Sequence, residues 1–172
     1  MIVSTDGWEF DFKDAIDAFV FDEKDKNKPN FHGVPMKAVD LLVELTEAYL
    51  LVEIKEYDDV SEFQWADTSI DDALSKKRRD TYKWLKNYLK YKYRDSLLFR
   101  FAEEKVNKPI HYLCLVNFDS PLNTILKKDL KQELPIGLVN KRWKMKLADS
   151  CQVLNENDWN RVFPKWQVRK ID

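Results

Sequence analysis

Two acids and one lysine stand out because of the strand-like runs that carry them. Glu53 and Lys55 end the run 48–55 (AYLLVEIK), which is rich in aliphatic and β-branched residues. Residues two apart along a strand share a face, so Glu53 and Lys55 are expected to point the same way. Asp40 lies a short hairpin upstream, inside another apolar run. Two carboxylates can hold a hard cation and a lysine can face a phosphate, so these residue types indicate metal-assisted phosphodiester chemistry.

The spacing of the acid and the lysine is only weakly specific. An acid two residues before a lysine occurs five times in the chain, but only the copy at Glu53 lies in an aliphatic, β-branched stretch. The alternative interpretation is an edge strand that exposes an ordinary Glu/Lys pair to solvent. Charged groups on buried strands are costly, so their burial would indicate a function.

An antiparallel hairpin is predicted to bring Asp40 to Glu53. Residues 37–45 alternate as a strand that places Asp40 and Glu44 on one face. The second strand, over residues 48–57, follows a short turn. In this hairpin Asp40 pairs near the Glu53 end of the second strand, which favours Asp40 over Glu44 as the partner carboxylate.

A helix is predicted over residues 11–23, because Phe12, Ile16 and Phe19 follow the three-and-four spacing of one helix face. Glu23 extends this apolar stripe and is therefore a candidate inward-pointing carboxylate. The alternative is a helix-end acid in solvent. Two loops are expected, because residues 24–37 are rich in turn formers and residues 58–72 are acidic.

A second helix, predicted over residues 71–93, has a basic stripe beside its apolar stripe. The basic stripe consists of Arg79, Lys83, Lys86, Lys90 and Arg94. Like charges at helical spacing repel by ~0.2–0.5 kcal/mol per pair. A nucleic-acid backbone would relieve this repulsion by contacting the stripe without reading sequence, whereas the alternative is a solvated helix face.

The charge of the chain is distributed unevenly, although its formal net value is only −1. Residues 1–72 contain 6 basic and 19 acidic side chains, whereas residues 76–94 contain 9 basic and 1 acidic. This asymmetry predicts an electrostatic face rather than a uniformly basic nucleic-acid binder.

The rest of the chain alternates strands and helices. A strand is predicted over residues 110–118, and a helix over 121–134 with Ser120 as its N-cap and Pro121 in its first turn. Further strands are predicted over 147–154 and 166–171, with a short helix starting at residue 155 between them. This order predicts one α/β domain over residues 1–172, with a mixed central β-sheet flanked by helices.

Composition excludes several other classes of site. Three glycines argue against a Gly-rich phosphate loop, and two histidines give little support to imidazole metal sites or Ser-His-Asp catalysis. Cys114 and Cys151 are interpreted as buried free thiols in a reducing compartment. No signal peptide or membrane-length apolar run is visible, so a cytoplasmic protein without membrane contact is expected.

The placement of Asp40, Glu53 and Lys55 resembles the PD-(D/E)xK phosphodiesterase superfamily, which has the restriction-endonuclease-like fold. The resemblance spans about residues 11–118 and depends on three motif residues. It implies a core of helix, three strands, helix and strand, although the strand before Asp40 is expected to be missing or very short. It also implies that Asp40 and Glu53 bind Mg²⁺ or Mn²⁺, that Lys55 stabilises developing charge, and that Glu23 completes the metal shell.

Two functions are compatible with this resemblance. The first is a metal-dependent endo- or exodeoxyribonuclease whose basic stripe binds DNA. The second is a catalytically inactive nuclease-fold protein that binds a protein or nucleic-acid partner, and a homodimer is also left open. The inactive alternative predicts that the three motif residues diverge or that another side chain fills the metal position.

Overall fold

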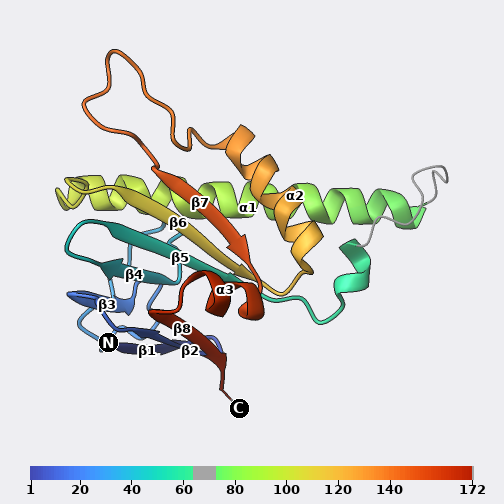
Figure 1. Ribbon diagram of the computed structural model, residues 1–172, viewed down its shortest axis with the longest axis horizontal. Helices are drawn as coiled ribbons and strands as arrows, with labels where there is room; N and C mark the ends of the chain where they lie inside the picture. The colour runs from blue at the N-terminus through green and yellow to red at the C-terminus, as the bar shows by residue number, and fades with distance from the viewer. Residues whose placement is uncertain (64–72, 172) are drawn as a thin grey trace.

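A mixed five-stranded sheet forms the centre of the structure and carries apolar side chains on both faces. The computed structural model describes residues 1–63 and 73–171 (Figure 1). The sheet contains, in spatial order, β3 (Asp17–Val20), β4 (Leu41–Glu44), β5 (Tyr49–Lys55), β6 (Ile110–Val116) and β7 (Ser150–Leu154). Strands β3, β4 and β5 form an antiparallel meander, whereas β6 and β7 run parallel to β5. The predicted α/β class with a mixed central sheet is confirmed.

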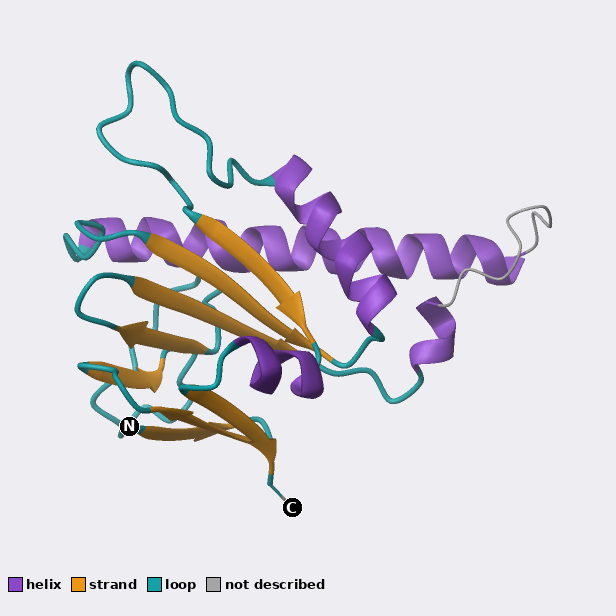
Figure 2. Cartoon of the chain, in the orientation of Figure 1, coloured by secondary structure: helices purple, strands orange, loops and turns teal. Residues whose placement is uncertain are grey.

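Helices cover one face of this sheet (Figure 2). The long helix α1 (Ala73–Ala102) connects β5 to β6, which is the crossover that a parallel pair requires, and α2 (Ser120–Glu133) connects β6 to β7. Leu85 and Leu89 of α1 are fully buried in the core between the helices and the sheet. None of the helices in the described part of the chain is long and apolar enough to cross a membrane.

A smaller layer covers the other face. It consists of a three-stranded antiparallel sheet and a short helix: β1 (Ile2–Thr5), β2 (Trp8–Phe12), β8 (Trp166–Lys170) and α3 (Glu156–Val162). Phe10, Phe12 and Trp159 are fully buried in this second core. A 3₁₀ turn, Val60–Phe63, follows β5. Because both faces of the central sheet are covered, β5 has a nearly continuous apolar sequence rather than an alternating one.

The predicted hairpin around the candidate site is confirmed. Strands β4 and β5 pair antiparallel with Leu41 opposite Val52, so the residue before Leu41 lies beside the residue after Val52. Strand β5 lies between β4 and β6, and Glu53 is fully buried. The alternative of an edge strand with an exposed Glu/Lys pair is therefore wrong.

The predicted helix over residues 11–23 is wrong. Strand β2 ends at Phe12, a turn follows, and β3 begins at Asp17. Ile16, which the helical stripe places in the core, is 56% exposed. The period-2 alternation of Trp8, Phe10 and Phe12 prevails because the small sheet gives these side chains a common buried face.

Smaller differences concern the ends of elements. The strand before Asp40, expected to be missing or very short, is present as the four-residue β3, in agreement with the second of these expectations. The N-cap of α2 is Asp119, whose side chain accepts the N–H of Leu122, and Ser120 is the first helical residue. Helix α1 continues through the segment 97–101 to Ala102. The predicted loop 58–72 and helix start at residue 71 extend into residues 64–72, which lie outside the described residues.

Candidate functional site

The hairpin places Asp40 directly beside Glu53. Asp40 immediately precedes β4, and its Oδ2 accepts the backbone N–H of Ile54 at 2.6 Å. The N–H of Phe21 donates to the carbonyl oxygen of Asp40 at 2.8 Å, which brings the end of β3 to the same point. Asp40 is 7% exposed and Glu53 is 0% exposed. Two of the predicted site residues are therefore neighbours in a buried position on the helix-facing side of the sheet.

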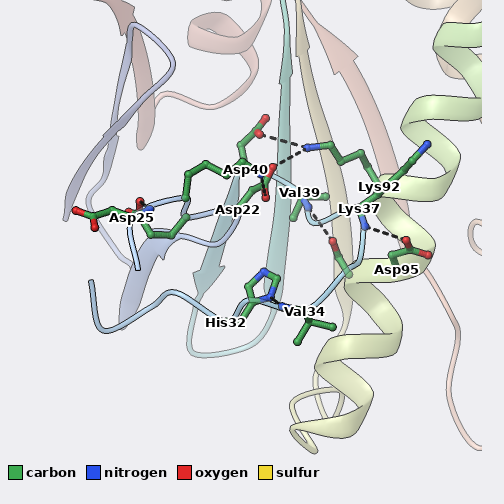
Figure 3. Close-up of polar contacts among 12 residues, drawn as sticks. Asp22, Asp25, His32, Val34, Lys37, Val39, Asp40, Lys92 and Asp95 are labelled. Atoms are coloured by element: carbon green, nitrogen blue, oxygen red, sulfur yellow. Dashed lines mark hydrogen bonds and ion pairs between the residues drawn. The ribbon is translucent and has the colours of Figure 1, made fainter. Parts of the chain in front are cut away.

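The segment that leads into β4 is attached to helix α1. The backbone N–H groups of Lys37 and Val39 donate to Asp95 Oδ2 and Ser96 Oγ, each at 2.9 Å (Figure 3). Ser96 is fully buried. These two hydrogen bonds set the position of Asp40 relative to the helix.

Lys92 of α1 extends its ammonium toward Asp22 and Asp40 (Figure 3), and the same ammonium reaches Glu53. Its Nζ lies 3.3 Å from Glu53 Oε2, 3.5 Å from Asp40 Oδ1 and 3.5 Å from Asp22 Oδ2. We call Asp22, Asp40 and Glu53 the carboxylate cluster. Three carboxylates around one ammonium leave a formal charge of −2 when all are ionised.

The electrostatics of the cluster follow from its burial. Burial raises the pKa of Glu53 well above its ordinary value, and the charge of Asp40 raises it further. Burial also raises the pKa of Asp40, although Lys92 and the Ile54 N–H act in the opposite direction. Burial lowers the pKa of Lys92, but Glu53 and Asp40 outweigh this effect, so the pKa of Lys92 is raised and the ammonium stays charged.

Glu53 has unsatisfied acceptors. Both of its side-chain oxygens are buried and accept no well-aligned hydrogen bond from a described residue, although Lys92 Nζ lies 3.3 Å from Oε2. A buried acceptor without a donor costs about 1–3 kcal/mol, and more when it is charged. A divalent cation is a hard acid that oxygen ligands bind well, so Asp40 and Glu53 fit such a group chemically. Within the described residues, however, no group of three or more Asp, Glu, His or Cys side chains is arranged to hold a metal ion, and Lys92 takes the position between the acids.

Lys55 is surrounded by aromatic rings rather than by acids. Its Nζ lies 5.2 Å from the ring centroid of Tyr57 and 5.5 Å from those of Trp84 and Tyr88. No ion pair joins Lys55 to a carboxylate among the described residues. The Tyr88 ring centroid also lies 5.4 Å from Lys92 Nζ, so one ring contacts both ammonium groups. Among the described residues, Lys55 thus contacts aromatic rings and no carboxylate.

Glu23 lies outside the carboxylate cluster. The loop after β3, not a helix, carries it, and its carboxylate accepts the N–H of Asp25 and pairs with Lys28 at 2.9 Å. These contacts lower the pKa of Glu23. Glu23 and Asp40 both line a polar cavity of about 330 Å³. The structure thus brings Asp22, rather than Glu23, to Lys92.

The predicted basic stripe lies on a different flank of α1 from Lys92. Lys86 and Lys90 pair with Asp129 and Glu133 of α2, at 3.9 and 2.9 Å. Lys83 and Arg94 are exposed, as is Arg79. The stripe therefore splits into a part neutralised by α2 and a part that faces solvent, and its binding of nucleic acid stays a prediction.

Sequence reasoning missed Lys92 and Asp22. Lys92 follows Leu85 by seven residues and Leu89 by three, so it lies on the apolar stripe of its helix. A lysine in that position is a signal that could have identified it. No comparable signal distinguishes Asp22 from Glu23, because the choice depends on where β3 ends.

A comparison of the chain with protein-family models, curated proteins and solved structures gave no match in any of the three.

Proposed function

We propose that this protein is a metal-dependent nuclease that hydrolyses phosphodiester bonds in DNA, with Asp40, Glu53 and Lys55 as its central residues. One observation carries the proposal: the buried acids Asp40 and Glu53, with Asp22 at their edge, have one ammonium for three carboxylates, and the oxygens of Glu53 accept no well-aligned hydrogen bond from a described residue. A divalent cation would neutralise the excess negative charge and satisfy those oxygens.

The order of the elements supports the proposal. The resemblance implies three strands, a helix and a strand, with Asp at the second strand and Glu-x-Lys on the third. Here β3, β4 and β5 are followed by α1 and β6, Asp40 precedes β4, and Glu53 lies on β5. The first helix that the resemblance implies is not found among the described residues. The β1–β2 hairpin precedes β3 in its place.

The residues of the chain have separate roles in this proposal. Asp40 and Glu53 would hold Mg²⁺ or Mn²⁺, and Asp22 is placed to assist them. The bound metal would polarise the scissile phosphate and lower the pKa of a water molecule. Lys55, positioned by its three rings, would stabilise negative charge that develops on the phosphate. Lys92 is the internal cation that balances part of the cluster's charge until the metal binds.

Thermal melting with Mg²⁺ or Mn²⁺ tests the metal site. The wild type is compared with Asp40→Asn and Glu53→Gln, and Glu47→Gln, an exposed turn acid, is the matched control. At a metal concentration of about 100 times Kd, binding to the folded state alone adds about 2.7 kcal/mol. For a chain of this size that corresponds to a rise in Tm of about 5–11 °C.

The outcomes separate the hypotheses. We expect wild type and Glu47→Gln to gain Tm with metal, and Asp40→Asn and Glu53→Gln to lose the gain. A metal-dependent cleavage assay on single- and double-stranded DNA follows, in which Lys55→Ala should retain the metal response but lose cleavage. A wild type that shows no metal response would contradict the proposal.

A specific observation favours a second candidate, a nuclease-fold protein without catalysis. The Lys92 ammonium occupies the point where a cation would lie between Asp40 and Glu53, as the inactive alternative predicts. Such a protein would bind a protein or nucleic-acid partner, and a homodimer is one form of this. It would show no metal response and no cleavage but would still bind its partner. A cytoplasmic location, where buried Cys114 and Cys151 remain thiols, belongs to either candidate.

A further inference from the structure

One flank of helix α1 exposes aromatic rings next to the candidate site. Trp84 is 51% exposed and Tyr91 is 43% exposed. The two residues are seven positions apart, which is about two helical turns, so they lie on the same flank about 10.5 Å apart along the axis. Tyr88 lies between them, and its ring stacks on that of Trp84 with centroids 4.9 Å apart and planes at 21°. We call Trp84, Tyr88 and Tyr91 the aromatic flank.

Cations surround every ring of the aromatic flank. Lys55 lies over Trp84 and Tyr88, as described above. Three cationic groups lie 5.4–5.9 Å from the Tyr91 ring centroid, and they belong to Lys37, Lys90 and Arg94. The flank therefore combines flat apolar surfaces with positive charge, whereas the chain as a whole has a net charge of −1.

The aromatic flank is continuous with the carboxylate cluster. Tyr88 borders Glu53, whose charge raises the pKa of the Tyr88 hydroxyl after the larger effect of burial. The Tyr88 ring lies within 5.5 Å of both Lys55 and Lys92, and Lys92 contacts the cluster. A ligand that stacks on Trp84 or Tyr91 would thus lie close in space to Asp40 and Glu53, the acids that would hold the proposed metal.

We infer that the aromatic flank binds single-stranded DNA by stacking unpaired bases on Trp84 and Tyr91, so that the substrate is a single strand or a single-stranded end. A stacking surface requires a planar ligand and the surrounding cations require an anion, and each nucleotide of a single strand provides both. In a duplex the faces of the bases are already stacked on one another. The inference rests on the proposed function, because it names the substrate of that same site.

Binding in EDTA tests the inference without relying on catalysis. Fluorescence anisotropy with a labelled oligothymidylate of about 12 nucleotides measures Kd for the wild type, Trp84→Ala, Trp84→Phe and Tyr91→Ala. Trp143→Ala is the matched control, because Trp143 is also exposed, at 39%, and lies among basic residues in the loop between α2 and β7 rather than on α1. A blunt duplex of the same length is the competitor.

We expect Trp84→Ala and Tyr91→Ala each to raise Kd about 5- to 150-fold, which corresponds to the loss of one stacked base. Trp84→Phe should retain most of the affinity, because phenylalanine still stacks, and Trp143→Ala should bind like wild type. Melting curves of the variants show whether each is folded. A wild type that does not bind the oligothymidylate or prefers the blunt duplex overturns the inference, and so does a folded Trp84→Ala that binds like wild type.

The failure of the nuclease proposal is distinguishable from the failure of this inference. Loss of binding in Trp84→Ala, together with no cleavage by the wild type in Mg²⁺, supports the aromatic flank and refutes the nuclease. Metal-dependent cleavage of the oligothymidylate that Trp84→Ala leaves unchanged refutes the flank and supports the nuclease.

Discussion

The replacement of Lys92 by methionine isolates the feature that organises the site. Methionine has a similar length and no charge, so Lys92→Met removes the ammonium and keeps most of the side-chain volume. The side chain of Lys92 is 7% exposed, and its Nζ is within 3.5 Å of all three members of the carboxylate cluster. The variant therefore leaves three carboxylates together without their cation.

The expected loss of stability is large. Breaking a buried ion pair by removing one partner costs about 3–5 kcal/mol, because the remaining charge is buried without compensation. Glu53 is fully buried and accepts no well-aligned hydrogen bond from a described residue, so only the neighbouring Tyr88 side chain remains to compensate it. For a domain of this size the loss corresponds to a decrease in Tm of about 6–20 °C.

The loss should depend on pH, with a defined sign. Burial raises the folded-state pKa of Glu53 and Asp40 above their ordinary values of 4.5 and 3.8, so the folded state binds these protons more tightly than the unfolded state. Stability therefore falls as pH rises from those values through the folded-state pKa values. Without Lys92 both pKa values rise further, and the fall continues to higher pH. The deficit of the variant is thus small below about pH 4 and largest near pH 8, where the wild-type Lys92 is still charged.

Urea denaturation at about pH 4 and pH 8 measures this deficit. Lys83→Met, at an exposed position on the same helix, is the control and should change stability by less than about 0.5 kcal/mol. Mg²⁺ should restore more stability to Lys92→Met than to wild type, because the metal then replaces the missing ammonium. A deficit at pH 8 no larger than that of Lys83→Met, or equal deficits at both pH values, would refute the electrostatic argument.

Three further changes test separate parts of the structure. Burial raises the folded-state pKa of Glu53, so ionisation of Glu53 lowers the stability of the wild type as pH rises. Urea titrations should therefore show the stability of Glu53→Gln, relative to wild type, increasing from about pH 4 to pH 8. Ser96→Ala leaves the buried N–H of Val39 without an acceptor and should cost about 1–3 kcal/mol in urea denaturation, with a weaker metal response if Asp40 shifts. Asp119→Ala should cost about 1 kcal/mol by removing the N-cap of α2, whereas Ser120→Ala should change little; equal losses in thermal melts would contradict the assignment of the cap.

Much of the fold could be predicted because the relevant patterns are local. The run 48–55 is apolar and β-branched over its whole length, and 110–118 is similar, so both appear as strands. The stripe Leu85, Leu89 and Tyr93 determines one face of α1. These signals depend on the residues' own periodicity and need no knowledge of their neighbours.

The N-terminal region could not be assigned in the same way. Residues 11–23 satisfy a helical spacing and a strand alternation at once. The pairing of β2 with β8 decides between the two patterns. In this pairing Phe12 lies opposite Trp166, which is 154 positions away in the sequence. A local signal for the preceding hairpin did exist: Asp6 and Gly7 both have positive φ, as expected for a tight Asp-Gly turn.

The sequence by itself determined that Asp40, Glu53 and Lys55 lie on one hairpin, because strand alternation and a short turn leave few other registers. Only the tertiary structure decided what surrounds them. Lys92 enters the carboxylate cluster because α1 crosses the sheet at one particular rotation, and Asp22 replaces Glu23 because β3 ends where it does. Contacts between elements far apart in the chain depend on packing in three dimensions, and no pattern within a single element encodes them.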